Sequence, residues 1–166
     1  MRPLDKQTRK AIAVFSLKVL IIAVVFALLL MFVVTLRICR SNDMYPNIKD
    51  GDLVVVQKTH DVTFDDVILY EHDGMEYFGR VVAVPGETVV INDEDGLVVN
   101  DNIVYNTLPY ATAMPEGEQE KIVVGDDEVF VLGDYRDGAR DSREFGCIDK
   151  QDAIGRQIYL MRWRGF

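Results

Sequence analysis

The chain has 166 residues, of which 49% are hydrophobic and 27% are charged, and its ordinary content of Gly (12) and Pro (5) excludes collagenous, low-complexity and wholly disordered proteins. Its charge is unevenly divided: residues 1–40 carry seven Lys or Arg and one acid, whereas residues 41–166 carry eleven Lys or Arg against 26 acids, a net charge of −15. A domain this acidic is repelled by a phosphate backbone, which excludes nucleic-acid binding.

The most apolar stretch covers residues 11–36 and contains a single charge, Lys18. At about 1.5 Å per residue, a helix of this length exceeds the roughly 30 Å of a bilayer's hydrocarbon core. The stretch ends without the small-residue site at which a signal peptide is cleaved, so it predicts a permanent transmembrane anchor helix.

The basic residues around the apolar stretch predict the orientation of the chain. Five of them precede its uncharged core and two follow it. Because the more basic flank stays inside, residues 1–10 are expected to form a cytoplasmic tail and residues 41–166 an extracytoplasmic domain. The sequence therefore predicts a single-pass protein of the plasma membrane.

After the anchor come short β-branched runs separated by turn residues, and no stretch has apolar residues at helical spacing over three turns. This pattern predicts a mostly antiparallel β domain behind the single helix. The expected strands are residues 53–58, 67–71, 77–84, 88–91, 97–99, 122–124, 129–132 and 154–161.

Few polar residues suggest chemistry by themselves. The two histidines lack His or Cys neighbours at ligand spacing, so neither a metal nor a cofactor is expected. Cys39 and Cys147 are too few for a disulfide scaffold and are expected to be free thiols. Residues 133–143 alternate acids and bases between glycines, which predicts an ordered loop held by ion pairs.

Four segments together resemble the type I signal peptidase family, the membrane-anchored proteases that remove signal peptides with a Ser/Lys dyad. They are residues 41–46, 49–54, 79–87 and 133–146, which stand in the family's order behind one N-terminal anchor. The resemblance implies a signal-peptidase-like β domain.

The catalytic positions depart from the family pattern. Asp43 stands where the family has its nucleophilic serine, and Gly79 stands where it has the lysine base. Ala139 replaces a further serine that contacts the lysine. Ser41 matches the residue whose hydroxyl helps to form the oxyanion hole, so it is either a remnant of the site or a substitute nucleophile.

The resemblance also implies that the framework around the site is retained. Within it, Arg136, Asp141 and Arg143 are expected to form structural ion pairs, and Asp43 is expected to cap a turn or to bond to the loop that carries the two arginines. Met44 either packs in the core or belongs to apolar surface beside the site. The framework residues are Met44, Pro46, Arg80, Asp134, Arg136, Asp141, Ser142 and Arg143.

Three functional hypotheses follow. The first is a non-catalytic signal-peptidase-like protein that binds an extended peptide in its groove; by resemblance to such homologues of Gram-positive bacteria, it is a pilus-assembly factor with pilin subunits and sortase as partners. The second is an active signal peptidase that uses Ser41 as nucleophile, with Lys49 or Lys58 as base. The third is a structural membrane protein that inherited the fold.

Overall fold

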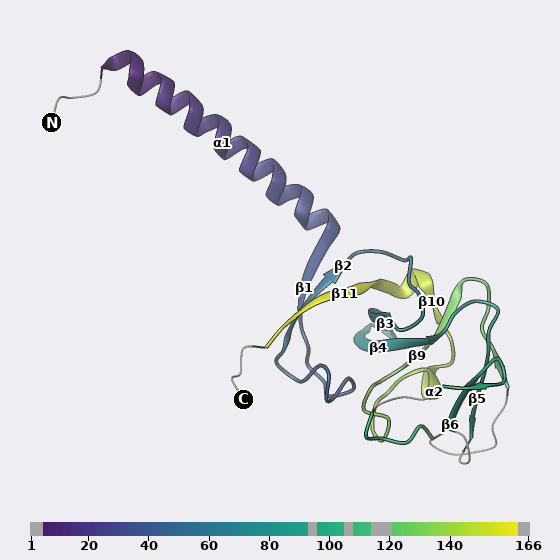
Figure 1. Cartoon of the computed structure of the whole chain (residues 1–166). Coiled ribbons are helices and arrows are strands. Elements are labelled where there is room, and N and C mark those ends of the chain that lie inside the picture. Colours follow the sequence, from purple (N-terminus) through teal and green to yellow (C-terminus); the bar gives the residue numbers. More distant parts are fainter. Residues whose placement is uncertain (1–4, 93–95, 105–107, 114–120, 163–166) are drawn as a thin grey trace. The chain divides into compact units, whose positions relative to one another are not determined.

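The computed structural model describes residues 5–92, 96–104, 108–113 and 121–162, so the start of the expected tail and the last four residues lie outside the described part. The chain divides into two compact units, residues 1–35 and residues 36–166. Figure 1 shows the helix of the first unit and the strands of the second.

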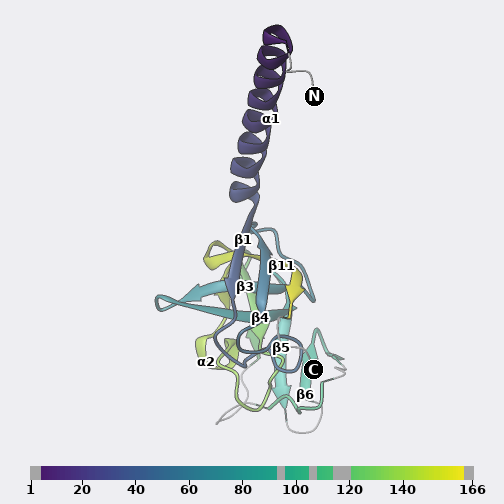
Figure 2. The same cartoon turned by 90° about the vertical axis from the view of Figure 1, so that its left-hand side faces the viewer.

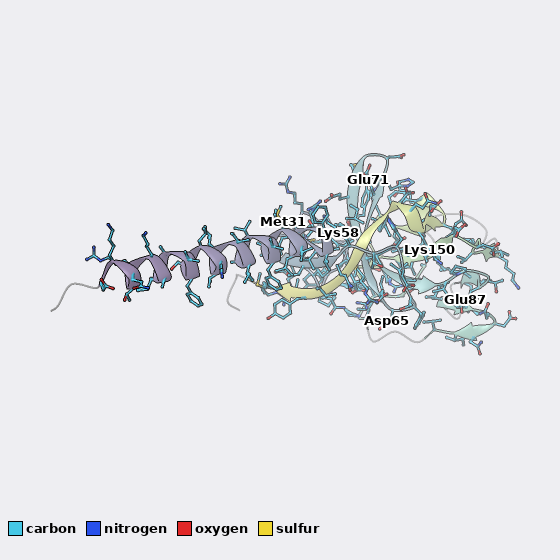
Figure 3. All side chains as sticks on the ribbon, turned by 90° about the horizontal axis from the view of Figure 1, so that it is seen from above. Met31, Lys58, Asp65, Glu71, Glu87 and Lys150 are labelled. Atoms are coloured by element: carbon cyan, nitrogen blue, oxygen red, sulfur yellow. The ribbon has the colours of Figure 1, made fainter. Side chains whose placement is uncertain are left out.

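The first unit is the helix α1, Lys6–Val33. Its residues are all exposed, and Figure 3 shows side chains projecting on every side of it. By length and composition it is the one helix of the described chain that is apolar enough to cross a membrane.

The helix ends at Val33, so the prediction that it continues to residue 36 is wrong. Val34 has the extended angles φ −129° and ψ 154°, and residues 34–38 form the strand β1, Val34–Ile38. Val34 and Thr35 are both β-branched, which favours a strand once a partner strand is available, here β2.

The second unit contains a seven-stranded sheet with the order β1-β2-β11-β3-β4-β9-β10 and a four-stranded sheet with the order β7-β6-β5-β8. Figures 1 and 2 show β5 and β6 set apart from the larger sheet. The pairings from β2 onwards are antiparallel, which confirms the predicted fold class. The strands are β2 Leu53–Gln57, β3 Val67–His72, β4 Met75–Ala83, β5 Thr88–Asn92, β6 Gly96–Val99, β7 Asn102–Ile103, β8 Ile122–Val123, β9 Glu128–Leu132, β10 Ile148–Asp149 and β11 Ala153–Met161.

All eight predicted strands are present to within two residues at each end. Two short helical segments were not predicted, α2 Ser142–Phe145 and a 3₁₀ turn at Lys150–Asp152. Neither is long enough to produce an apolar periodicity in the sequence.

The strands bury alternate residues, as in β2, where Val54 and Val56 are buried between partly exposed neighbours. One core cluster includes Cys39, Met44 and Ile48 from the segment after β1. Because these three side chains are at most 1% exposed, they hold that segment firmly against the sheet.

Candidate functional site

Asp43 lies in the segment between β1 and β2. Backbone hydrogen bonds between the two ends of this segment close it into a loop. Cys39 N–H donates to the carbonyl of Asp52 at 2.9 Å, and Gly51 N–H donates to the carbonyl of Cys39 at 2.8 Å. The side chain of Met44 is fully buried, so of the two readings of this residue the structure supports core packing.

The backbone of Asp43 meets the loop that follows β9. Its carbonyl accepts a hydrogen bond of 2.9 Å from Tyr135 N–H. A Cβ atom at Gly133 would lie 2.6 Å from the same carbonyl and would collide with the Cβ of Ala139, so only glycine fits there. Asp43 and Ala139, which the resemblance assigns to one catalytic unit, therefore lie beside each other.

Gly79 lies in β4, and packing fills the space that a side chain would need. A Cβ atom built at Gly79 collides with Cγ1 of Val131 and lies 3.4 Å from Cε1 of Tyr70. Val131 is fully buried in β9. An apolar side chain thus stands where a lysine at position 79 would have to start.

Tyr70 is the unusual polar group of this region. Its side chain is fully buried, yet its hydroxyl has no hydrogen-bond partner in the described part of the protein. Burial raises the pKa of this hydroxyl far above its ordinary value, and the nearby carboxylates of Asp141 and Asp43 raise it further. Nothing in the sequence indicated this tyrosine.

No general base contacts Ser41 in the described part of the chain. Within the described residues, no lysine donates or accepts a hydrogen bond at its hydroxyl, and its carbonyl accepts one from the thiol of Cys39 at 3.2 Å. Lys49 instead lies over the ring of Tyr45, with Nζ 5.1 Å from the ring centroid. The arrangement therefore lacks the amine–hydroxyl contact that a relocated dyad requires.

The expected ion pair in the 133–143 loop is present between Asp141 and Arg143. The guanidinium donates from Nε and from Nη2 to the carboxylate, each at 2.9 Å, and both side chains are at most 5% exposed. Asp141 also accepts from Gly133 N–H at 2.9 Å, and the hydroxyl of Ser142 accepts from Val131 N–H at 2.9 Å. These bonds fix the loop to the end of β9.

Arg136 does not form the ion pair that was expected. In the described residues it donates from Nη1 to the hydroxyl of Thr112 at 3.1 Å, and its Nε has no partner. Asp141 is paired with Arg143, and Arg136 interacts with the carboxylates of Asp134 and Asp141 only at longer range. Burial lowers the pKa of Arg136 to about 10.

The buried carboxylate of Asp134 joins β4 to the same loop. It accepts from Nε of Arg80 at 2.9 Å, from Nη2 of Arg80 at 2.8 Å, and from Asn47 at 2.7 Å. These hydrogen bonds raise the pKa of Arg80. Arg80 donates further to the carboxylate of Asp65, a residue labelled in Figure 3, at 3.0 Å.

In the described residues the carboxylate of Asp43 makes neither of the contacts expected of it, a turn cap or a bond to the arginines of the loop. Within the part of the chain that is described, it accepts no hydrogen bond and forms no ion pair. Arg143 is bound to Asp141, and Arg140 is bound to Glu144 with its shortest contact at 2.7 Å. In the described residues Asp43 is thus a half-buried acid that no cation binds directly, although Arg140 is close enough to interact with it electrostatically.

Asp43 lines a groove with a volume of about 760 Å³, whose walls come from residues 36–43 and from the start of β4. On the side facing β9, β4 is paired only from Arg80 onwards, so in the described chain residues 75–79 have no partner strand there; Met75 and Glu76 are exposed, whereas residues 77–79 are buried. An ion pair joins the two walls, with Nε of Arg37 3.0 Å from the carboxylate of Glu76. The groove is lined by Leu36, Arg37, Ile38, Arg40, Ser41, Asp43, Leu69, Met75, Glu76, Tyr77 and Phe78.

Other chemistry has little support in the described residues. They contain no group of three His, Cys, Asp or Glu side chains placed to hold a metal ion. Cys39 and Cys147 are free cysteines, and burial raises the pKa of each thiol. Neither thiol lines the groove.

Comparisons with known proteins agree with the resemblance. The model of the signal peptidase family, peptidase S26, matches residues 12–163. A probable signal peptidase I-1 of Synechocystis is 31% identical over 159 residues, which cover 87% of this chain and 80% of its own length. An inactive signal peptidase IA of Staphylococcus aureus is 30% identical over 147 residues, 82% of this chain and 84% of its own length.

A solved structure is also similar, that of a signal peptidase I from Enterococcus faecalis, with 23% identity and a TM-score of 0.48 over 57% of this chain and 95% of its own. The family match covers α1 and nearly all of the β domain, so the apolar helix belongs to a membrane protein of this kind. The chain is a member of the signal peptidase family, peptidase S26.

Proposed function

We propose that this protein has no peptidase activity and binds extended peptide segments of partner proteins as an assembly factor at the outer face of the plasma membrane. The observation that carries the proposal is Gly79, which supplies no base and whose side-chain space is filled by Val131. An inactive relative of similar length supports it.

Asp43 adds an electrostatic reason for inactivity. In peptide hydrolysis a negative charge develops on the carbonyl oxygen in the transition state. A carboxylate about 4 Å from that oxygen costs on the order of 4 kcal/mol at an effective dielectric constant near 20, about a thousandfold in rate. Arg80 cannot act as the base, because a guanidinium stays protonated.

The groove supports peptide binding. An extended peptide that adds to a sheet edge takes its affinity from main-chain hydrogen bonds, which need no catalytic residue. Residues 75–78 of β4 line the groove and are not paired with β9, so they offer such an edge. The framework bonds Arg80–Asp134 and Arg143–Asp141 hold its surroundings in place.

The cellular role is proposed from the family resemblance: a pilus-assembly factor on a Gram-positive cell surface, with its tail in the cytoplasm and its β domain outside, acting on pilin subunits beside sortase. The test is a pull-down of pilin and sortase by the full chain in detergent. Retention of either partner at micromolar concentration is expected, and retention of neither would refute the pilus assignment.

A matched pair of variants tests whether the groove is responsible. Met75 lines it and is 50% exposed, whereas Ile103 lies in β7, outside the groove, and is 40% exposed. Met75→Arg should abolish retention and Ile103→Arg should leave it intact. In parallel, a preprotein with an Ala-x-Ala site should stay uncleaved, and cleavage that disappears in Ser41→Ala would establish the alternative, an active peptidase.

A further inference from the structure

We propose that Asp43 is a recognition subsite for a basic side chain, lysine or arginine, of the extended peptide in the groove. This assignment rests on the proposed function, since it specifies the chemistry of the segment that the groove binds. It gives the residue at the former nucleophile position a role in selecting partners.

The first reason is the unpaired state of Asp43. Its carboxylate lines the groove, is half-buried, and has no hydrogen-bond or ion-pair partner within the described residues. A carboxylate that is partly removed from water and left unpaired is unfavourable. A cation brought by a ligand would remove that cost without any rearrangement of the protein.

The second reason is the buried hydroxyl of Tyr70. It has no partner in the described part of the chain, and it is close enough to Asp43 for the two groups to interact electrostatically. Gly79, whose Cβ position is 3.4 Å from the ring of Tyr70, contributes no side chain to this region. The acid and the hydroxyl thus lie near each other, and β4 supplies no cation between them.

The third reason is the pairing of the other charges. Arg37 is held by Glu76 and Arg140 by Glu144. Arg140 is close enough to Asp43 to interact with it electrostatically, but neither guanidinium forms a hydrogen bond or ion pair with Asp43 in the described residues. Arg40, a further charged residue of the groove lining, is exposed, where water and salt screen it. Asp43 is therefore a half-buried charge of the lining without a directly bound cation, and a peptide side chain in the groove would meet it.

The test uses three fluorescein-labelled decapeptides of alternating alanine and threonine that differ at one central residue, which is lysine, glutamine or glutamate. Each is titrated with the full chain in detergent micelles, and binding is measured by fluorescence anisotropy. Because alanine and threonine are small, the peptide can shift along the groove until its central residue reaches Asp43. The binding register therefore need not be known in advance. The lysine peptide should bind about tenfold more tightly than the glutamine peptide, the ratio that corresponds to 1.4 kcal/mol.

Two variants assign the preference to Asp43. Asp43→Asn should bind the lysine and glutamine peptides equally, whereas Asp61→Asn, an exposed acid outside the groove that makes the same change in net charge, should keep the tenfold ratio. The comparison of peptides on the unchanged protein needs no variant to fold.

The outcomes separate this inference from the proposed function. Equal binding of the lysine and glutamine peptides to the unchanged protein would overturn the basic subsite and leave peptide binding standing. Tighter binding of the glutamate peptide would overturn it in favour of Arg40. Absence of binding by all three peptides would refute the peptide groove itself, and the subsite with it.

Discussion

Restoring the dyad by substitution should fail for a reason of packing. A lysine at position 79 needs a Cβ atom where Cγ1 of Val131 already lies. Val131 is fully buried and, being β-branched, has little rotamer freedom with which to move aside. Overpacking of this kind costs about 1–3 kcal/mol, so we expect Gly79→Ala to lower the free energy of unfolding by that amount.

A double-mutant cycle isolates the contact. Val131→Ala alone should cost about 2 kcal/mol through lost burial, but Gly79→Ala should then cost little in the Val131→Ala background, a coupling of about 1–2 kcal/mol. Urea unfolding of the full chain in detergent is followed by near-ultraviolet circular dichroism, because every tyrosine lies outside α1. A cost below about 0.5 kcal/mol for Gly79→Ala in both backgrounds would refute the reasoning.

The same packing should control whether peptidase activity can be restored. Asp43→Ser, Gly79→Lys and Ala139→Ser together restore the family's side chains, but cleavage of an Ala-x-Ala preprotein is expected only when Val131→Ala is added, since the lysine then has room. The unchanged protein should be inactive, because loss of a catalytic dyad costs orders of magnitude in rate. Full activity in the triple variant without Val131→Ala would contradict this.

Three further predictions concern residues around the groove. The Arg37–Glu76 ion pair joins the two walls of the groove, so an entering peptide has to separate it. Glu76→Gln should therefore raise the affinity for an extended peptide about two- to fivefold at low salt. An unchanged affinity in the anisotropy titration would contradict this. Arg80→Met should destabilise the fold by about 3–5 kcal/mol in urea, since it leaves the buried carboxylate of Asp134 unpaired, and a loss below about 1 kcal/mol would show that the carboxylate finds another partner. Burial raises the pKa of Cys147 to about 11 from 9.0, so the reactive thiolate is scarcer at neutral pH. Alkylation of Cys147 at pH 8, followed by mass spectrometry, should be about a hundredfold slower than that of an unperturbed thiol and should accelerate about tenfold per pH unit up to pH 11. Alkylation at the rate of an unperturbed thiol would contradict this.

The strands could be predicted because their signal is local. β2 alternates buried and half-exposed residues, and β9 is a β-branched and apolar run next to turn residues. The end of α1 was missed because Val34 is apolar and Thr35 is uncharged, like the residues of the helix before them. The helix gives way there to the extended strand β1, and no local pattern in the sequence marks that change.

The candidate site was predictable in its residues and not in its contacts. The family resemblance predicts that Asp43 and Ala139 belong to one unit, and the structure places them beside each other. The alternation of charges in 133–143 indicated the Asp141–Arg143 pair. The partner of Arg136 is Thr112, 24 residues away in a different segment, and this distance in sequence hides the contact. That Asp141 pairs with Arg143 and not with Arg136 is likewise visible only when three-dimensional neighbours are known.

The site and the groove beside it are subject to different physical constraints. A catalytic dyad requires two side chains within hydrogen-bond reach and an amine that can lose its proton, so one glycine at position 79 is enough to end it. Once the lysine is absent, nothing prevents a buried neighbour such as Val131 from packing into its place, and that packing opposes a return of the lysine. The proposed recognition of an extended peptide would depend instead on main-chain hydrogen bonds at the edge of β4 and on the framework pairs Arg80–Asp134 and Arg143–Asp141, and these interactions need no side chain of a dyad. Loss of catalysis and retention of a binding groove are therefore compatible in one fold, and the unpaired carboxylate of Asp43 is the point at which the two can be distinguished by experiment.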